Sequence, residues 1–152
     1  MKKSLASLLL IPAFAFAQNS YETLKLNIPK NTLEPKSVRF SNDAIFLDGQ
    51  KCFNYVIKHN VIIANQKIPN YFEISSLEDV VLFSGSIKKN DSGNFESSID
   101  FLPINKLNYS NSKIIGRNAL ILNLSSNQVL NNNCSLNLDN LRLFYEKSNE
   151  NN

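Results

Sequence analysis

The chain has 152 residues, of which 43% are hydrophobic and 19% are charged, and its net charge is +3 at neutral pH. This length suffices for one domain with a buried core. No run of basic residues exceeds two, as at Lys88-Lys89, and no basic stripe is present. A nucleic-acid partner, which would need a positively charged footprint, is therefore not expected.

Residues 1–17 have the pattern of a secretory signal peptide. Two lysines follow Met1, an apolar run extends over residues 4–16, and the small residues Ala15 and Ala17 precede Gln18. We expect cleavage between Ala17 and Gln18, with a cut after Ala15 as the alternative. The apolar run has about 13 residues, whereas a membrane-spanning helix needs about 20, so we expect an exported chain without a transmembrane segment.

The compartment is inferred from this leader. The short Met-Lys-Lys start and the abundance of Asn, Lys, Ile and Ser are typical of a bacterial chain, and no cysteine follows either cleavage site, so a lipoprotein is not expected. We predict a periplasmic or secreted protein. Without Lys2 and Lys3, 14 basic residues remain against 13 acidic ones, which leaves a mature net charge of +1 and no case for electrostatic membrane binding.

The only cysteines are Cys52 and Cys134. Export places them in an oxidising compartment, and an even number predicts one intramolecular disulfide. The alternatives are a redox-active pair and metal ligation. The two residues are far apart in sequence and form no Cys-x-x-Cys motif, which favours the structural bridge.

The mature chain is strand-like over most of its length. Residues 24–28 and 38–40 alternate apolar and polar side chains. The apolar-rich runs 44–47 and 50–53 flank Asp48-Gly49, the strongest short-range hairpin signal. A two-residue loop there would place Ile45 opposite Cys52, with the thiol on the buried face.

A second hairpin is predicted from residues 80–88 and 95–102, which flank a turn that ends at Gly93. On its returning strand Phe95, Ile99 and Phe101 share one face, whereas Glu96, Ser98 and Asp100 share the other. Further strands are expected at 61–64, 71–75, 114–124 and 141–146.

These patterns predict an all-β fold, a single antiparallel β-sandwich or barrel-like domain over residues 18–147 with one disulfide. Residues 148–152 are expected to form a polar, frayed tail. No internal repeat, linker or domain boundary is apparent.

Candidate catalytic groups are few. His59 is the only histidine, and Lys58-His59-Asn60 has the composition of a turn, so we expect a surface residue and assign no catalytic residue to it. No metal or cofactor site is expected, because neither zinc-ligand spacing nor a phosphate-binding glycine loop is present. The carboxylate pairs Glu78-Asp79 and Glu96/Asp100 fit a solvated surface better than a glycosidase centre.

The aromatic residues are compatible with glycan binding at the surface. Most phenylalanines fall at core positions, and the chain has no tryptophan. The tyrosines combine an apolar ring with a polar tip, which suits a surface that contacts a glycan. They are Tyr21, Tyr55, Tyr71, Tyr109 and Tyr145.

Three functions remain open. The first is a non-enzymatic binding or interaction module of the bacterial envelope, whose partner is an unknown protein or glycan and whose oligomeric state is undetermined. The second is an assembly subunit of a surface fibre, since residues 21–28 alternate as a donated strand would. In this strand, in size and in its two cysteines the chain resembles pilus subunits of the chaperone–usher kind; its wide cysteine spacing and its Asn-Glu-Asn-Asn end differ from that family. The third is a small carboxylate-dependent hydrolase.

Overall fold

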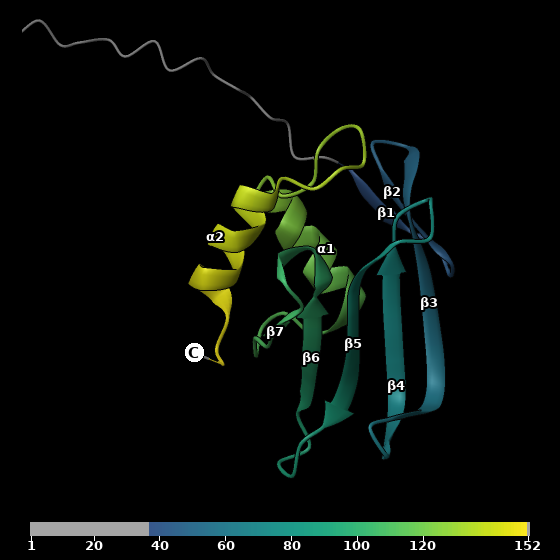
Figure 1. Cartoon of the computed structure of the whole chain (residues 1–152), viewed down its shortest axis with the longest axis vertical. Helices are drawn as coiled ribbons and strands as arrows, with labels where there is room; N and C mark the ends of the chain where they lie inside the picture. The colour runs from purple at the N-terminus through teal and green to yellow at the C-terminus, as the bar shows by residue number, and fades with distance from the viewer. Residues whose placement is uncertain (1–36, 152) are drawn as a thin grey trace, which may run out of the picture. The chain divides into compact units, whose positions relative to one another are not determined.

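The computed structural model describes residues 37–151, which form one antiparallel sheet and two α-helices (Figure 1). The predicted signal peptide, its cleavage site and the strand expected at 24–28 lie outside the described residues. The elements are β1 (Val38–Phe40), β2 (Ala44–Leu47), β3 (Gln50–Ile63), β4 (Gln66–Ser75), β5 (Val81–Lys89), β6 (Phe95–Phe101), a 3-10 turn (Leu102–Ile104), β7 (Leu107–Tyr109), α1 (Gly116–Ser126) and α2 (Leu138–Ser148).

The seven strands run in the order β1 to β7, each paired with the next, so every connection within the sheet is local. The hairpin predicted at Asp48-Gly49 is confirmed, because both residues have positive φ (49° and 82°) and Leu47 pairs with Gln50. The pairing of Ile45 with Cys52 is wrong. A β-bulge after Ile45 shifts the register, and this residue lies opposite Phe53.

The hairpin of β5 and β6 is also confirmed, and Gly93 takes the left-handed conformation (φ 81°) in its turn. Ile99 and Phe101 are fully buried on one face of β6, as the alternation predicted. Phe95 is 57% exposed because it lies at the turn end of β6, beyond the reach of the covering helices.

The turn expected around His59 and the strand expected at 61–64 are parts of one long strand. β3 runs without interruption from Gln50 to Ile63, so His59 lies within a strand and not in a turn. The register pairs His59 with Asn70 and Val61 with Ile68, which places Asn60 opposite Pro69. Proline has no N–H to donate, and Asn60 has a left-handed backbone (φ 55°) at this point.

The strands expected at 114–124 and 141–146 are wrong, since both segments are helical. Residues 119–122 form a nearly continuous apolar run, which sequence periodicity cannot separate from a buried strand. In α1 the buried residues Leu120, Ile121 and Leu124 have helical spacing. In α2 the side chain of Asn137 caps the first turn by accepting a hydrogen bond from the backbone N–H of Asn140 (3.0 Å).

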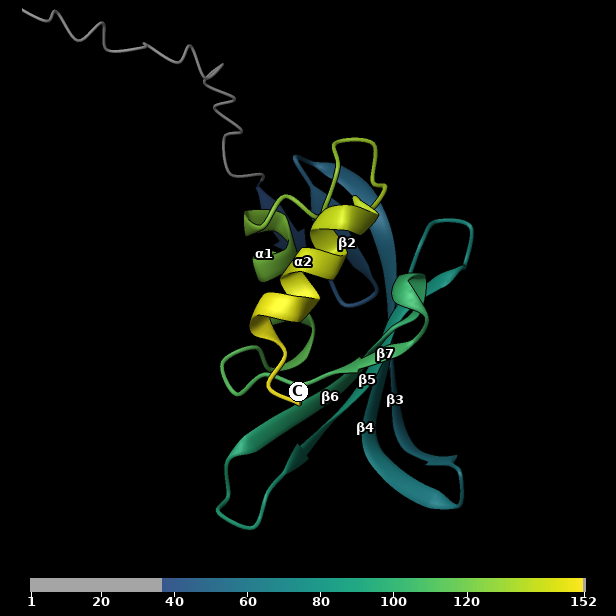
Figure 2. The same cartoon turned by 60° about the vertical axis from the view of Figure 1, so that its left-hand side comes forward.

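The helices cover one face of the sheet and leave the other face open (Figure 2). Side chains that point to the helices form the buried core, among them Phe72, Phe83 and Ile99 from the sheet and Leu120 and Leu141 from the helices. The fold therefore has two layers, a mostly β structure in which helices supply the second layer. Within residues 37–151 no helix is long and apolar enough to cross a membrane.

An aromatic cluster attaches α2 to the last strands. The rings of Phe101 and Tyr109 stack at 4.8 Å between centroids, and the ring of Phe144 from α2 lies 5.6 Å from that of Tyr109. The Tyr145 hydroxyl donates to the Asn108 carbonyl (3.0 Å). The segment that was expected to form a frayed tail also contacts the domain. The Glu150 carboxylate accepts hydrogen bonds from the backbone N–H and the hydroxyl of Ser112, which follows β7.

An arginine attaches α1 to the opposite end of the sheet. The Arg117 guanidinium lies 3.9 Å from the centroid of the Tyr55 ring, and its Nη1 donates to the Ser41 carbonyl (2.8 Å). Burial raises the pKa of the Tyr55 phenol, and the positive charge of Arg117 acts in the opposite direction.

The predicted Cys52–Cys134 disulfide is present. It joins β3 to the loop between α1 and α2, with 5.0 Å between the two Cα atoms and 82 positions between the residues in sequence. Cys52 is buried in the core, where 2% of its surface is exposed.

Gly85 on β5 has no room for a side chain. A Cβ at this position would lie 2.6 Å from the Ser98 carbonyl oxygen and 3.1 Å from the Phe72 ring. We therefore expect Gly85→Ala to lower the free energy of unfolding by about 1–3 kcal/mol through overpacking. Urea denaturation measures this loss, and Ser86→Ala on the same strand is the control; equal stability of the two variants would contradict the packing argument.

Reduction of the disulfide should destabilise the protein. The loop-entropy relation gives about 4–5 kcal/mol for a closed loop of this length. We expect the urea midpoint of the reduced, alkylated protein to fall accordingly, or the protein to unfold without denaturant. Coincident unfolding curves for the oxidised and reduced proteins would refute this prediction.

Candidate functional site

A groove of about 490 Å³ lies at the end of the sheet where α2 begins. Its apolar lining comes from β5, the 3-10 turn, the β4–β5 turn and the residues before and at the start of α2. These residues are Leu77, Leu82, Pro103, Leu136 and Leu138. Hydrogen-bonding side chains surround them, namely Gln50, Ser76, Glu78, Asn133 and Ser135. A volume of this size and a lining of this kind are typical of ligand sites.

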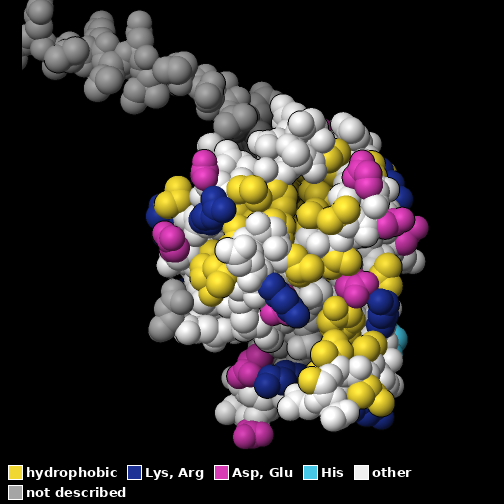
Figure 3. All heavy atoms as spheres, in the orientation of Figure 1, with side chains coloured by type: hydrophobic (Ala, Val, Ile, Leu, Met, Phe, Trp, Pro, Cys, Tyr) yellow, Lys and Arg dark blue, Asp and Glu magenta, His cyan; other side chains and the backbone are white. Residues whose placement is uncertain are grey.

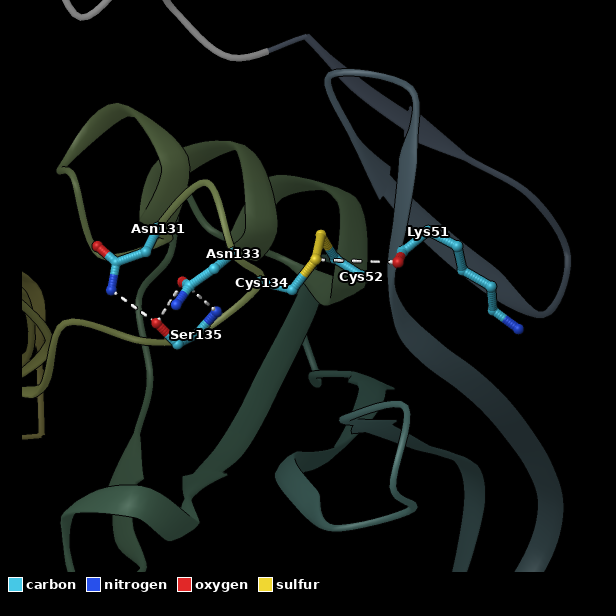
Figure 4. The surroundings of a disulfide bond; sticks show 6 residues. All are labelled: Lys51, Cys52, Asn131, Asn133, Cys134 and Ser135. Carbon is cyan, nitrogen blue, oxygen red and sulfur yellow. Dashed lines mark hydrogen bonds between the residues drawn. A yellow bond between two sulfur atoms is a disulfide. The ribbon is translucent and has the colours of Figure 1, made fainter.

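One wall of the groove is the loop between the two helices, and the disulfide attaches it to β3 (Figure 4). The loop is closed by hydrogen bonds among its own residues. Asn131 Nδ2 donates to Ser135 Oγ (2.9 Å), and this hydroxyl donates to Asn133 Oδ1 (2.6 Å). Cys134 has a left-handed backbone (φ 65°), which the turn imposes. This wall is therefore held in one conformation by a covalent bond and a side-chain network.

The opposite wall is the β4–β5 turn. Asn54 Nδ2 on β3 donates to the Ser76 carbonyl (3.3 Å) and to Asp79 Oδ1 (3.2 Å). Ser76 Oγ accepts a hydrogen bond from the backbone N–H of Glu78 (3.2 Å). Asp79 has positive φ (60°), a conformation that its side chain tolerates. These hydrogen bonds hold both walls in place, and with them the leucines that the walls contribute to the groove, Leu136 and Leu77.

Two of these leucines are open to solvent. Leu77 is 46% exposed and Leu138 is 42% exposed. Figure 3 shows that hydrophobic side chains gather on this face of the molecule toward the end where α2 begins. The two leucines therefore offer apolar surface to a ligand in the groove.

The predicted candidate residues lie in different places. The His59 ring is on β3, where its Nδ1 lies 3.1 Å from Asn70 Oδ1, distant in register from the groove. Glu78 and Asp79 form part of the β4–β5 turn, as expected, and Glu78 lines the groove. Metal binding needs several converging donors; within residues 37–151 no group of three or more His, Cys, Asp or Glu side chains is so placed.

Glu96 and Asp100 share the open face of β6, as predicted from alternation. They are four residues apart, which corresponds to about 13 Å along a strand. Glu96 accepts a hydrogen bond from Asn90 Nδ2 (2.8 Å), whereas Asp100 accepts one from Asn108 Nδ2 (3.0 Å). The two carboxylates therefore belong to separate hydrogen-bonded pairs.

The described tyrosines divide between the two faces. Tyr109 is buried in the core, where burial raises its phenol pKa, opposed by a hydrogen bond with Ser148. Tyr71 is the tyrosine that lies on the open face, paired with Lys58 and Ser86 on the neighbouring strands. Burial also raises the Tyr71 pKa, and its hydrogen bond with Ser84 acts against this shift.

Sequence reasoning did not find the groove. Its leucines come from segments that are far apart in the chain, and none forms a recognisable motif. The signal that pointed toward it was the predicted disulfide, which brings Cys134 beside β3.

Comparison of the chain with protein-family models, with curated proteins and with solved structures finds no significant match. The function is therefore inferred from the geometry of the groove.

Proposed function

We propose that the protein is an exported, non-enzymatic binding module of the bacterial envelope, and that it holds a peptide segment of a partner protein in the groove. The single observation that carries this proposal is the leucine-lined groove of about 490 Å³ between two fixed walls. Preformed walls favour binding because little conformational entropy is lost when the partner docks. The disulfide agrees with an oxidising compartment, periplasmic or extracellular.

The lining indicates the chemistry of the partner. Leu77 and Leu138 offer aliphatic contacts, and Glu78 is the charged side chain among the described lining residues. Complementarity therefore favours a segment with aliphatic side chains next to one lysine or arginine. The serine and asparagine side chains on the walls can pair with its backbone groups.

Binding also accounts for the lining better than catalysis. Glycoside hydrolysis uses two carboxyl groups that flank the scissile bond. The groove offers one such group, Glu78, and its two cysteines are joined in the disulfide.

Site-specific photocrosslinking tests the proposal. A photoreactive phenylalanine analogue at Leu77, in the exported protein within cells, should give a discrete adduct with a partner protein. The additional substitution Glu78→Lys should reduce its yield several-fold, because it places a like charge opposite the partner's basic residue.

Leu122 provides the matched control. It is 47% exposed on α1 and lies outside the groove, so the same analogue there should give no adduct. The proposal fails if both positions give the same adducts, if Leu77 gives none, or if Glu78→Lys leaves the yield unchanged.

A further inference from the structure

The open face of the sheet carries a second concavity, a cleft of about 310 Å³. One side is formed by β5, β6 and β7, on the face that the helices leave uncovered. The other side is the tip of the β3–β4 hairpin, which extends beyond the last residue of β4 that pairs with β5, Tyr71. In Figure 2 the ends of β3 and β4 curve away from those of β5 and β6.

The floor of the cleft is a set of hydrogen-bonding side chains in two cross-strand rows. One row contains Ser84, Asp100 and Asn108, and the other contains Tyr71, Ser86 and Ser98. Neighbouring strands lie about 4.8 Å apart, so polar groups recur at this interval across the floor. Serine is the commonest residue in these rows, and its short side chain leaves the space above the sheet open.

Several of these groups are held in place before any ligand binds. Asn108 Nδ2 donates to both Ser98 Oγ (2.8 Å) and Asp100 Oδ1 (3.0 Å). Ser84 is buried in the floor, where 8% of its surface is exposed. Hydroxyl groups both donate and accept, so the floor can adapt to a ligand that presents groups of the same kind.

The hairpin tip supplies an apolar wall to this polar floor. Ile63, Ala64 and Ile68 line the cleft, and they lie on the tip side of the irregularity at Asn60 and Pro69. Within the floor, Tyr71 adds an aromatic ring with a polar tip. A ligand for this cleft therefore needs one apolar face and a polar edge.

The charged residues in and near the cleft indicate which ligands of this shape it can bind. Asp100 and Lys106 line the cleft with opposite charges, and the nearby Lys58 and Glu73 form an ion pair (3.0 Å). The local charges cancel, so neither a polyanion nor a polycation is attracted. The carboxylate of Asp100 further disfavours an acidic ligand at the floor.

From these features we infer that the open-face cleft is a binding site for a neutral oligosaccharide. A pyranose ring presents apolar C–H groups to the isoleucine wall and the Tyr71 ring, and its hydroxyls pair with the serine, asparagine and aspartate side chains. This site is separate from the groove, so it gives the protein a second ligand class.

Titration of the mature protein with neutral and acidic oligosaccharides, monitored by amide chemical shifts, tests the inference. The probes are tetramers of β-1,4-linked N-acetylglucosamine, of β-1,4-linked glucose and of galacturonic acid. We expect a neutral tetramer to give saturable shifts at Ser84, Ser86, Ser98 and Asn108, and the acidic tetramer to bind at least about tenfold more weakly.

Variants that fill the cleft provide the second arm. Ser86→Ile/Ser98→Ile should weaken binding by about tenfold or more, because it blocks the floor and removes two hydroxyls. Ser92→Ile/Ser126→Ile adds the same side chains in the β5–β6 turn and on α1, and it should bind as the wild type does. If the first variant does not fold, Asn108→Leu, at an exposed position of β7, should cause a similar loss.

Three results would overturn the inference. They are the lack of saturable shifts with either neutral tetramer at about 10 mM, shifts that map to the groove and not the cleft, and equal affinity of the cleft variants and their control. The photocrosslinking at Leu77 reports on the groove alone, so the two proposals fail independently.

Discussion

The covalent bond between Cys52 and Cys134 holds together the parts of the chain that the sheet cannot organise by itself. All sheet connections are local, since each strand pairs with the next one in sequence. The loop between the helices, by contrast, reaches β3 only across 82 positions of sequence. Because the same loop forms one wall of the groove, the bond that stabilises the fold also fixes the position of the candidate site.

One-sided coverage explains how two different sites coexist. The helices supply the apolar layer that buries Phe72, Phe83 and Ile99. The opposite face carries the two polar rows that form the floor of the cleft. The groove lies at the edge of the helical layer, so leucines from the edge of the core line it. The cleft lies on the uncovered face of the sheet, so serines line it. The position of each site relative to the helices thus determines its chemistry.

The sequence predicted those features that depend on neighbouring residues. Asp48-Gly49 and Gly93 specified their hairpins, because positive φ at these positions selects few residue types. α1 was missed because the run around Leu120 is apolar on most sides, so tertiary packing decides its conformation. The groove and the cleft could not be predicted, since each joins segments whose proximity depends on strand register and helix docking.

Asn60 and Pro69 have a consequence for the long β3–β4 hairpin. Within residues 37–151, β3 pairs with β2 only as far as Asn54, and its remaining edge includes Val61, Ile62 and Ile63, a segment with strong β propensity. An exposed edge of this composition is a template for addition of a further chain. The left-handed backbone at Asn60 breaks the regular pattern of that edge, and the proline on the partner strand removes a donor from the other edge. Both features make the edges of this hairpin poorer templates for a further strand.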